Sequence, residues 1–212
     1  MTLSELVTHT SIWLGVPRTV VESHARYLRE DGLLTSGARG LAAPSMTAND
    51  KISLFVTVLG CGNARASAKA LPKLLSLVRS SIVRSSSEKL LEDIDDPSLF
   101  EQPNLQKALL AMFEDMADGR FDRWRQLVET VLVKVNVARP LSLDLTVTFE
   151  IDAEYVVIRL RASGKWGKKM NVAVGPEIEF GTAPASTVAG YSRRTHEISY
   201  ERLVGWGSCM AA

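Results

Sequence analysis

The chain has 212 residues, of which 46% are hydrophobic and 23% are charged, an ordinary globular composition that excludes a largely disordered protein. The formal net charge is only +1, so nucleic-acid binding would need a local basic patch. Two cysteines, Cys61 and Cys209, are too few for a disulfide framework, and no apolar stretch approaches the length of a membrane helix. We therefore expect a cytoplasmic, reduced protein without a signal peptide.

The first predicted elements are two short helices joined by a tight turn. Ser4 is a suitable N-cap for a helix that ends at Gly15, and Pro17 begins a second helix that runs to about Asp31. In the second helix three apolar residues recur at i, i+4 and i+7 and should form its buried face: Val21, Ala25 and Leu28.

Turn residues then divide the next segment of the chain. The stretch "SGARG" at residues 36–40 predicts a tight basic turn with Arg39 between two glycines. A capped helix is expected at 47–60, and a fourth helical stretch at about 64–83, where Pro72 should produce a kink or a restart.

The middle of the chain alternates in charge. Residues 46–90 contain seven basic and two acidic residues, whereas residues 91–120 contain two basic and eight acidic ones. Within this part of the chain the polar, acidic stretch 84–104, which we call the acidic segment, is interrupted by Pro97 and Pro103 and is expected to form a linker or a long surface loop. Two further helices are predicted at 105–118 and 121–135.

A change of hydrophobic period marks β-structure in the last third of the chain. Apolar odd-numbered residues alternate with polar even-numbered ones from Leu141 to Ile151, as in a strand with one wet face. We predict that this strand pairs antiparallel with Tyr155–Ala162 and turns its odd-numbered side chains to the core. Shorter strands are expected at "MNVAV", "EIEF" and "RRTHEIS". The predicted fold class is α+β, with helices first and an antiparallel sheet after them.

One stretch near the N-terminus carries a resemblance to a known family. Residues 14–34, "LGVPRTVVESHARYLREDGLL", contain a Leu-Gly-apolar turn, a helix and an L-x-x-x-G-L-L ending. This stretch resembles the recognition half of a winged helix-turn-helix DNA-binding domain, as found in bacterial and prophage transcriptional regulators. The resemblance covers residues of about 4–44 and implies that the helix at about 17–31 reads a DNA major groove.

The resemblance implies a DNA-reading face on this second helix, opposite its apolar residues. Arginines suit guanine, hydroxyls suit phosphates or base edges, a valine suits a thymine methyl, and a glutamate suits only cytosine N4. These candidates are Arg18, Thr19, Val20, Glu22, Ser23 and Arg26. Arg39 on the predicted wing would enter an A·T-rich minor groove. For His24 two roles stay open, packing within the helices and contact with a phosphate.

A basic stripe on the fourth helical stretch supplies further candidates. Arg65, Lys69 and Lys73 repeat every four residues and therefore share one helical face. Such a stripe either follows DNA phosphates or faces solvent and pairs with the acidic segment.

Two residues depart from the family pattern. Ile12 and Trp13 occupy positions that are usually polar, and too few residues precede the helix pair to form the family's first helix. We expect the helix at 47–60 to take that place, and either this helix or a partner subunit to bury Ile12 and Trp13. Because operators are usually read by symmetric dimers, we expect a homodimer.

Other constellations give weaker signals. Trp166 among three lysines either stacks on single-stranded nucleic acid or packs against its own sheet. Glu150, Asp152 and Glu154 fit the wet face of a strand better than a metal site. The sequence lacks nucleophile-elbow, zinc-protease and phosphate-loop motifs, so we expect no enzymatic activity, no metal and no cofactor.

The sequence as a whole predicts a sequence-specific DNA-binding transcriptional regulator in three parts. These are a winged helix-turn-helix at 1–62, a helical segment with an acidic linker at 63–120, and an α+β dimerisation or effector domain at 121–212. The expected partners are double-stranded DNA, a second copy of the chain and a protein bound through the C-terminal part, without a membrane. We expect this regulator to be bacterial or phage-derived. The alternative is a non-enzymatic structural or adaptor protein of phage origin that uses its helical N-terminus for protein contacts.

Overall fold

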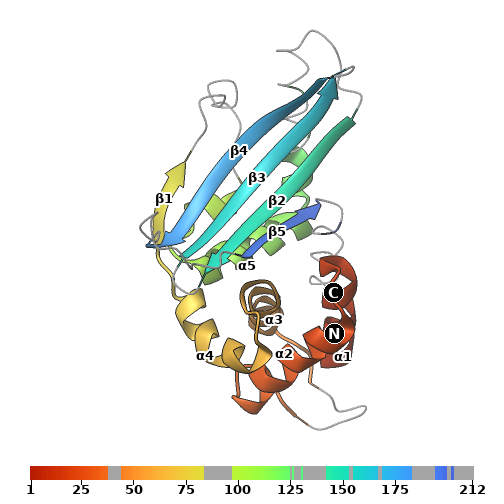
Figure 1. The fold of residues 1–212 in the computed structure, drawn as a ribbon, viewed down its shortest axis with the longest axis vertical. Helices are drawn as coiled ribbons and strands as arrows, with labels where there is room; N and C mark the ends of the chain where they lie inside the picture. Colours follow the sequence, from red (N-terminus) through yellow and green to blue (C-terminus); the bar gives the residue numbers. More distant parts are fainter. Residues whose placement is uncertain are drawn as a thin grey trace.

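The described part of the chain combines N-terminal helices with an antiparallel sheet, the α+β class predicted from the sequence, although strand β1 precedes the last helices (Figure 1). The computed structural model describes residues 1–37, 44–83, 97–124, 142–152, 155–166, 169–182 and 194–199, with the single residues 126, 130 and 202. In chain order the elements are α1 (Leu3–Leu14), α2 (Arg18–Glu30), α3 (Ala48–Gly60), α4 (Ala64–Leu75), β1 (Arg79–Val83), the 3₁₀-helix η3 (Ser98–Glu101), α5 (Leu105–Ala117), β2 (Ser142–Asp152), β3 (Tyr155–Trp166), β4 (Lys169–Gly181) and β5 (Arg194–Ser199).

The first helix begins slightly earlier than predicted. Thr2, not Ser4, is the N-cap of α1, and its hydroxyl accepts from the backbone N–H of Glu5. The Glu5 carboxylate accepts from the backbone N–H of Thr2 at 2.7 Å, which completes a capping box. This bond from the Thr2 backbone, and a second one that the Thr2 hydroxyl donates to the same carboxylate at 3.1 Å, lower the pKa of the Glu5 carboxyl. Ser4 is also a capping residue type, but no glutamate or glutamine lies three positions after it to complete a capping box.

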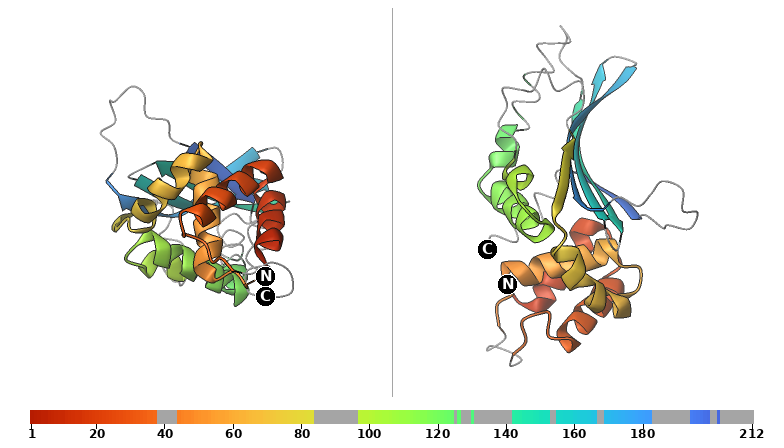
Figure 2. Two further views of the ribbon diagram at one scale, coloured as in Figure 1. Left: turned by 90° about the horizontal axis from the view of Figure 1, so that it is seen from below. Right: turned by 90° about the vertical axis from the view of Figure 1, so that its left-hand side faces the viewer.

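The third helix is the centre of the molecule. Every residue of α3 from Asp50 to Leu59 is buried, as expected for a helix whose residues from Ile52 to Leu59 are mostly apolar. It packs against α1, α2 and α4 on one side and against α5 and the sheet on the other (Figures 1 and 2). The helix predicted at 47–60 therefore does lie beside both members of the N-terminal helix pair.

The sheet has five strands in the order β1-β4-β3-β2-β5, and every neighbouring pair is antiparallel. Asp152 of β2 lies opposite Tyr155 of β3, so the predicted pairing is confirmed. Phe149 and Ile151 are buried, which confirms the predicted odd-numbered core face at the end of β2 that meets the helices. The side chains of residues 142–148 lie outside the described part.

One hydrophobic cluster joins the helices to the sheet through α3. The ring of Phe55 makes edge-to-face contacts with Phe113 of α5, at 5.6 Å between centroids, and with Phe149 of β2, at 5.3 Å. Gly60 lies so close to the sheet that a Cβ atom there would come within 2.7 Å of Ile151 Cγ2. The cluster extends from Leu6 to Ile198 and so includes residues of all three predicted parts; the boundaries of those parts stay predictions.

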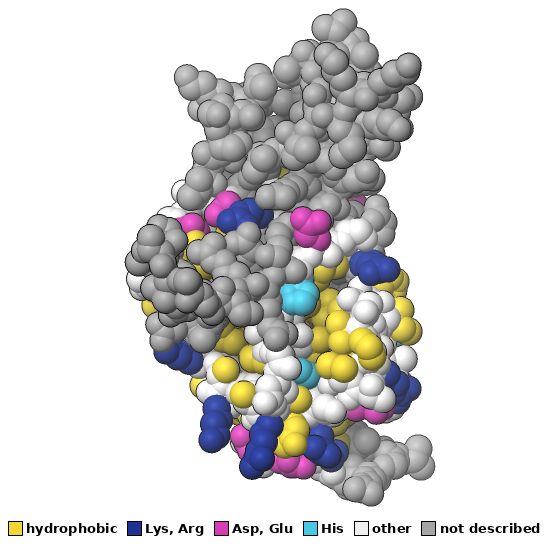
Figure 3. Space-filling view, viewed as in Figure 1, with side chains coloured by type: hydrophobic (Ala, Val, Ile, Leu, Met, Phe, Trp, Pro, Cys, Tyr) yellow, Lys and Arg dark blue, Asp and Glu magenta, His cyan; other side chains and the backbone are white. Residues whose placement is uncertain are grey.

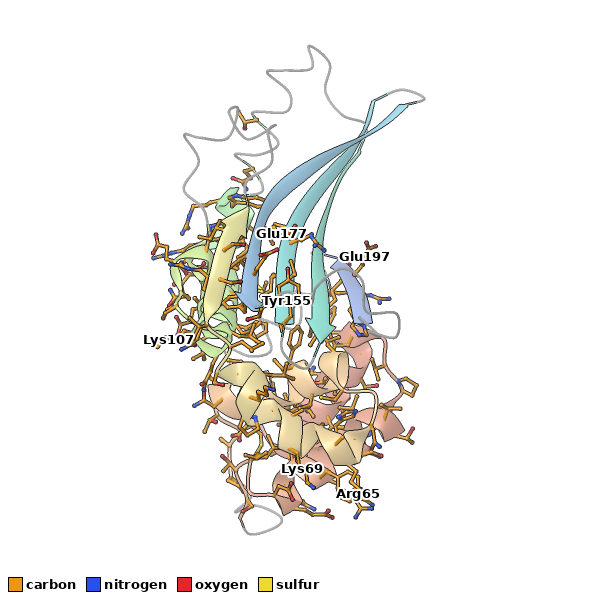
Figure 4. The ribbon with its side chains drawn as sticks, turned by 60° about the vertical axis from the view of Figure 1, so that its left-hand side comes forward. Arg65, Lys69, Lys107, Tyr155, Glu177 and Glu197 are labelled. Carbon is orange, nitrogen blue, oxygen red and sulfur yellow. The ribbon has the colours of Figure 1, made fainter. Side chains whose placement is uncertain are left out.

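The opposite face of the sheet carries a polar network. The Glu179 carboxylate accepts from the Ser81 hydroxyl at 2.6 Å and from the Tyr155 hydroxyl at 2.7 Å. Arg159 forms an ion pair with Glu177 directly across the β3–β4 ladder. Figure 4 shows Tyr155, Glu177 and Glu197 on the sheet, well away from the lower end of the helices. Tyr155 is buried and Arg159 and Glu177 are half-buried, and the polar even-numbered side chains of β2 that were predicted to face solvent lie outside the described part.

Two predictions about secondary structure are wrong. The helix expected at 64–83 ends at Leu75, and Arg79–Val83 is instead an edge strand that pairs with β4. The strands expected at "MNVAV" and "EIEF" are one continuous strand, β4, whose pairing with β3 continues past Gly175 and Pro176 with an irregularity of register at these two residues. In both places long-range strand pairing prevails over local propensity.

The other predicted helices fall partly within the described residues. Helix α5 matches the helix expected at 105–118, and residues 120–124 are helical with Phe121 and Trp124 buried. Within the described ranges no helix combines the length and apolar character needed to cross a membrane. The same ranges contain no group of three or more His, Cys, Asp and Glu side chains placed to hold a metal ion.

Candidate nucleic-acid interface

The turn between α1 and α2 sets the direction of α2 relative to α1. Gly15 adopts the left-handed conformation, with φ of 66°, and its backbone N–H donates to the Ser11 carbonyl. The Ser11 hydroxyl donates to the carbonyl of Val16 at 2.8 Å, which ties both sides of the turn together. Pro17 then occupies the N-cap of α2, where its missing N–H has no cost.

The inner face of α2 follows the predicted periodicity. Val21, Ala25 and Leu28 are all buried, as the i, i+4, i+7 spacing indicated. His24 is only 2% exposed and belongs to this face, so the alternative that it contacts phosphate is wrong. Its position one turn after Val21 and one turn before Leu28 places it among the apolar residues rather than among the polar ones.

The six candidate residues of α2 lie on the side away from the core, and together they define what we call the outer face of α2. Five of them are exposed and Ser23 is half-buried. Val20 exposes 41% of its surface, although an apolar side chain of this size is usually buried. The members of the outer face are Arg18, Thr19, Val20, Glu22, Ser23 and Arg26.

Two ion pairs run along the outer face in the free protein. Arg18 Nε lies 2.8 Å from the Glu22 carboxylate, and Arg26 Nε lies 3.7 Å from that of Glu30. All four side chains are at least half exposed, and exposed pairs of this spacing contribute only about 0.3–0.5 kcal/mol each. Either arginine can therefore exchange its carboxylate for a phosphate or a base at little cost.

A groove between α1 and α2 adds an arginine that the sequence reading missed. The groove has a volume of about 330 Å³ and is lined by Leu3, Ser4 and Val7 of α1 and by Arg18, Arg26 and Arg29, among others, of α2. Arg29 lies eleven positions after Arg18, and this i, i+11 spacing returns to the same helical face. That spacing was the available signal for Arg29.

The basic stripe of α4 is exposed beside α2. Arg65, Lys69 and Lys73 all face outward, and α4 packs directly against α2. Arg65 and Lys69 lie toward the lower end of the helical part in Figure 4. Lys and Arg side chains gather at this end, with acidic ones among them (Figure 3). The stripe and the outer face of α2 thus belong to neighbouring helices.

The segment that leads from α2 toward the predicted wing is attached to α3. The buried Asp50 carboxylate accepts from the backbone N–H and the hydroxyl of Thr35, each at 2.8 Å. It also accepts from the N–H and hydroxyl of Thr47, the N-cap of α3. Burial alone would raise the pKa of Asp50, but these four hydrogen bonds outweigh it, and the pKa is lowered.

Several predicted residues lie outside what the structure describes. Arg39 and the tip of the predicted wing belong to the undescribed stretch 38–43, and the described residues between α2 and α3 contain no strand. The side chains of Glu150, Asp152 and Trp166 and all of Glu154 are likewise outside the described part. A winged form of the helix-turn-helix is therefore not confirmed.

Comparison with protein-family models, with curated proteins and with solved structures finds no match for this chain. The outer face of α2, the turn before it and the neighbouring basic stripe are therefore the basis on which a function can be argued.

Proposed function

We propose that the chain is a sequence-specific double-stranded-DNA-binding regulator of transcription, in which α2 reads the major groove. The observation that carries the proposal is the outer face of α2: a packed helix behind a tight left-handed turn presents arginines, hydroxyls and an exposed valine to solvent. An α-helix fits the major groove, where base edges offer a distinct pattern of donors, acceptors and methyl groups. The proposed function is non-enzymatic.

Each member of the outer face has a distinct role in this proposal. Arg18 and Arg26 donate to guanine O6 and N7, and Thr19 and Ser23 bind phosphates or base edges. Val20 contacts a thymine methyl. Glu22 holds Arg18 in the free protein at 2.8 Å and, on DNA, accepts from cytosine N4 or releases the arginine to its base.

The surrounding basic residues supply affinity that does not depend on sequence. Lys69 and Lys73 of α4 neutralise phosphates, and each such contact makes binding more sensitive to salt. Arg39 is proposed to enter a minor groove from the wing, at a stretch attached to α3 through Asp50 and Thr35. Arg29 joins the phosphate contacts because it lines the groove beside Arg18 and Arg26.

A selection experiment followed by quantitative binding tests the proposal. The full chain is used to enrich sites from random-sequence duplex DNA, and fluorescence anisotropy then measures affinity at about 50 and 200 mM salt. Arg18→Ala and Arg26→Ala should each lose about 1–3 kcal/mol of discrimination at one or two base positions. Lys69→Ala should instead weaken all sequences alike and reduce the salt slope by about one.

Arg123→Ala is the matched control, because Arg123 is an exposed arginine that follows α5 and lies outside the outer face of α2. It should bind like the wild type. If Arg18→Ala and Arg26→Ala both retain wild-type affinity and base preference, α2 does not read DNA, and the adaptor function becomes the leading one.

We also propose that the protein acts as a homodimer that meets through α1. Ile12 is 61% exposed, so α3 does not cover it, and this exposed apolar side chain supports burial by a second subunit. Trp13, by contrast, packs against the chain's own core. In sedimentation equilibrium, Ile12→Glu should give a folded monomer, whereas Val78→Glu, at an apolar residue that is 67% exposed elsewhere, should leave the dimer intact. A wild-type monomer would refute this proposal.

A further inference from the structure

A second site is formed by α3 and α5, on helices that do not carry the outer face of α2. These helices lie side by side (Figure 2) and are joined by a hydrogen bond from Gln106 Nε2 to Asn49 Oδ1 at 3.0 Å. Between them is a cavity of about 170 Å³, which we call the α3–α5 cavity. It is slightly larger than an apolar cavity of about 150 Å³ that holds one benzene ring, so it suits a small organic molecule.

The wall of the α3–α5 cavity is apolar. Ile52, Leu110 and Phe113 line it. Ile52 and Phe113 are buried, whereas Ala48 and Ala117, which also line it, are exposed. The cavity therefore has an apolar interior and a mouth toward solvent. An aliphatic or aromatic group of a bound ligand would be removed from water in this cavity, which favours binding.

Two side chains of opposite charge line the same cavity. Lys51 of α3 is only 6% exposed, which is rare for a lysine, and it lines the cavity together with Glu114 of α5, which is exposed. An ammonium has three N–H donors, so Lys51 can donate to a ligand carboxylate in addition to acceptors of the chain itself. Such a bond is strong where the dielectric constant is low. Glu114 can accept from a ligand ammonium at the mouth.

We propose that the α3–α5 cavity binds a free apolar α-amino acid. The carboxylate of the amino acid accepts from Lys51, its ammonium group donates to Glu114, and its side chain fills the space beside Ile52, Leu110 and Phe113. A molecule with only one of the two charges would leave the other protein group without its ligand partner. The proposal does not rest on DNA binding, because no residue of α2 lines the cavity.

Isothermal titration calorimetry of the full chain with L-leucine tests the site. At the efficiency common for small ligands, leucine should saturate a single site below about 10 mM. Two analogues separate the charges: 3-methylbutylamine lacks the carboxylate, and 4-methylpentanoate lacks the ammonium. The amine should bind at least about tenfold more weakly, because it forgoes the buried charge-assisted bond to Lys51. The acid should bind up to about fivefold more weakly, because Glu114 is exposed.

Matched variants assign the effect to the cavity. Lys51→Met keeps most of the apolar stem but removes the charge, and it should weaken leucine binding about tenfold or more. Ala117→Leu narrows the mouth from an exposed position, so it should fold normally and abolish binding. Lys107→Met is the control for Lys51→Met, since Lys107 is an exposed lysine of α5 (labelled in Figure 4) that does not line the cavity.

Four results would overturn the proposal. Three are no saturable heat with either L-leucine or L-phenylalanine, undiminished binding by Ala117→Leu, and equal affinity for leucine and 3-methylbutylamine. If 4-methylpentanoate binds more tightly than leucine, the cavity selects monocarboxylates, and the amino-acid assignment is wrong.

Discussion

Helices α2 and α3 have the same length, thirteen residues, and pack against each other, but they use their side chains in opposite ways. Helix α3 is buried from Asp50 to Leu59, and its residues connect the N-terminal helices to α5 and the sheet. Helix α2 buries a single stripe and leaves a mostly polar, exposed face whose two ion pairs lie within the helix itself. Residues of α3 should therefore determine stability, whereas those of the outer face of α2 are available for binding.

The largest effect is expected in the middle of α3. Phe55 is fully buried between Phe113 and Phe149, so Phe55→Ala should lower the free energy of unfolding by about 3–5 kcal/mol. Val20→Ala on the outer face of α2 should change it by less than about 0.5 kcal/mol. Urea unfolding followed by circular dichroism measures both. Equal costs for the two variants would contradict the division of roles between these helices.

A smaller loss is expected where α3 holds the segment after α2. Asp50→Asn should cost about 2 kcal/mol, because a buried carboxylate accepts four hydrogen bonds from Thr35 and Thr47. The control is Asp31→Asn, at an exposed aspartate just after α2, which should leave stability nearly unchanged.

The contribution of Asp50 should also depend on pH in a defined direction. Its pKa is lowered in the folded state, so its stabilising effect is fully present above the ordinary carboxyl pKa of about 3.9. That effect is lost as the pH falls from there through the lower folded pKa. Unfolding free energies measured across this acidic range should fall less steeply for Asp50→Asn than for the wild type. An identical slope in the two proteins would show that Asp50 is not held as a hydrogen-bonded carboxylate.

The turn before α2 should be the next most sensitive position. Gly15→Ala places an L-residue at φ of 66° and a Cβ atom 3.2 Å from Arg202 Nη1, so it should cost about 1–2 kcal/mol. Gly32→Ala after α2 meets the same kind of φ, 72°, but has nothing within 4 Å. Gly32→Ala therefore measures the cost of the left-handed conformation alone. The further loss of melting temperature in Gly15→Ala measures the cost of displacing the Arg202 side chain. A cost for Gly15→Ala below that for Gly32→Ala would be inconsistent with this geometry.

The regular local patterns were predictable from the sequence. The spacing of Val21, Ala25 and Leu28 gave the buried side of α2, and the alternation up to Ile151 gave the core face of β2. Each pattern depends on a few neighbouring residues whose period matches one kind of element. The exposed positions of the outer face of α2 followed from the same helical period.

The features that could not be predicted from the sequence depend on contacts between residues far apart in the chain. Strand β1 pairs with residues that lie nearly a hundred positions later, as the Ser81–Glu179 hydrogen bond illustrates, and no local pattern indicates such a partner. The α3–α5 cavity likewise forms only where two helices that are far apart in the sequence pack against each other. Its only sequence signal was Lys51 at the start of the apolar run "ISLFVTVLG".

The smallest effect on stability is expected for a change of Glu22, and the same change should strengthen DNA binding. Glu22→Gln removes the exposed ion pair with Arg18, so it should change the unfolding free energy by less than about 0.5 kcal/mol. On DNA the same change removes a negative charge that repels phosphate and frees Arg18, so binding to random-sequence duplex should become a few-fold tighter at low salt. If Glu22 also accepts from cytosine N4, the variant should lose preference at that base pair while it gains affinity for other sequences. Glu101→Gln, at an exposed glutamate in η3, controls for the change in net charge and should affect neither property. Weaker binding of Glu22→Gln to every sequence would mean that Glu22 positions Arg18 on DNA rather than restraining it in the free protein.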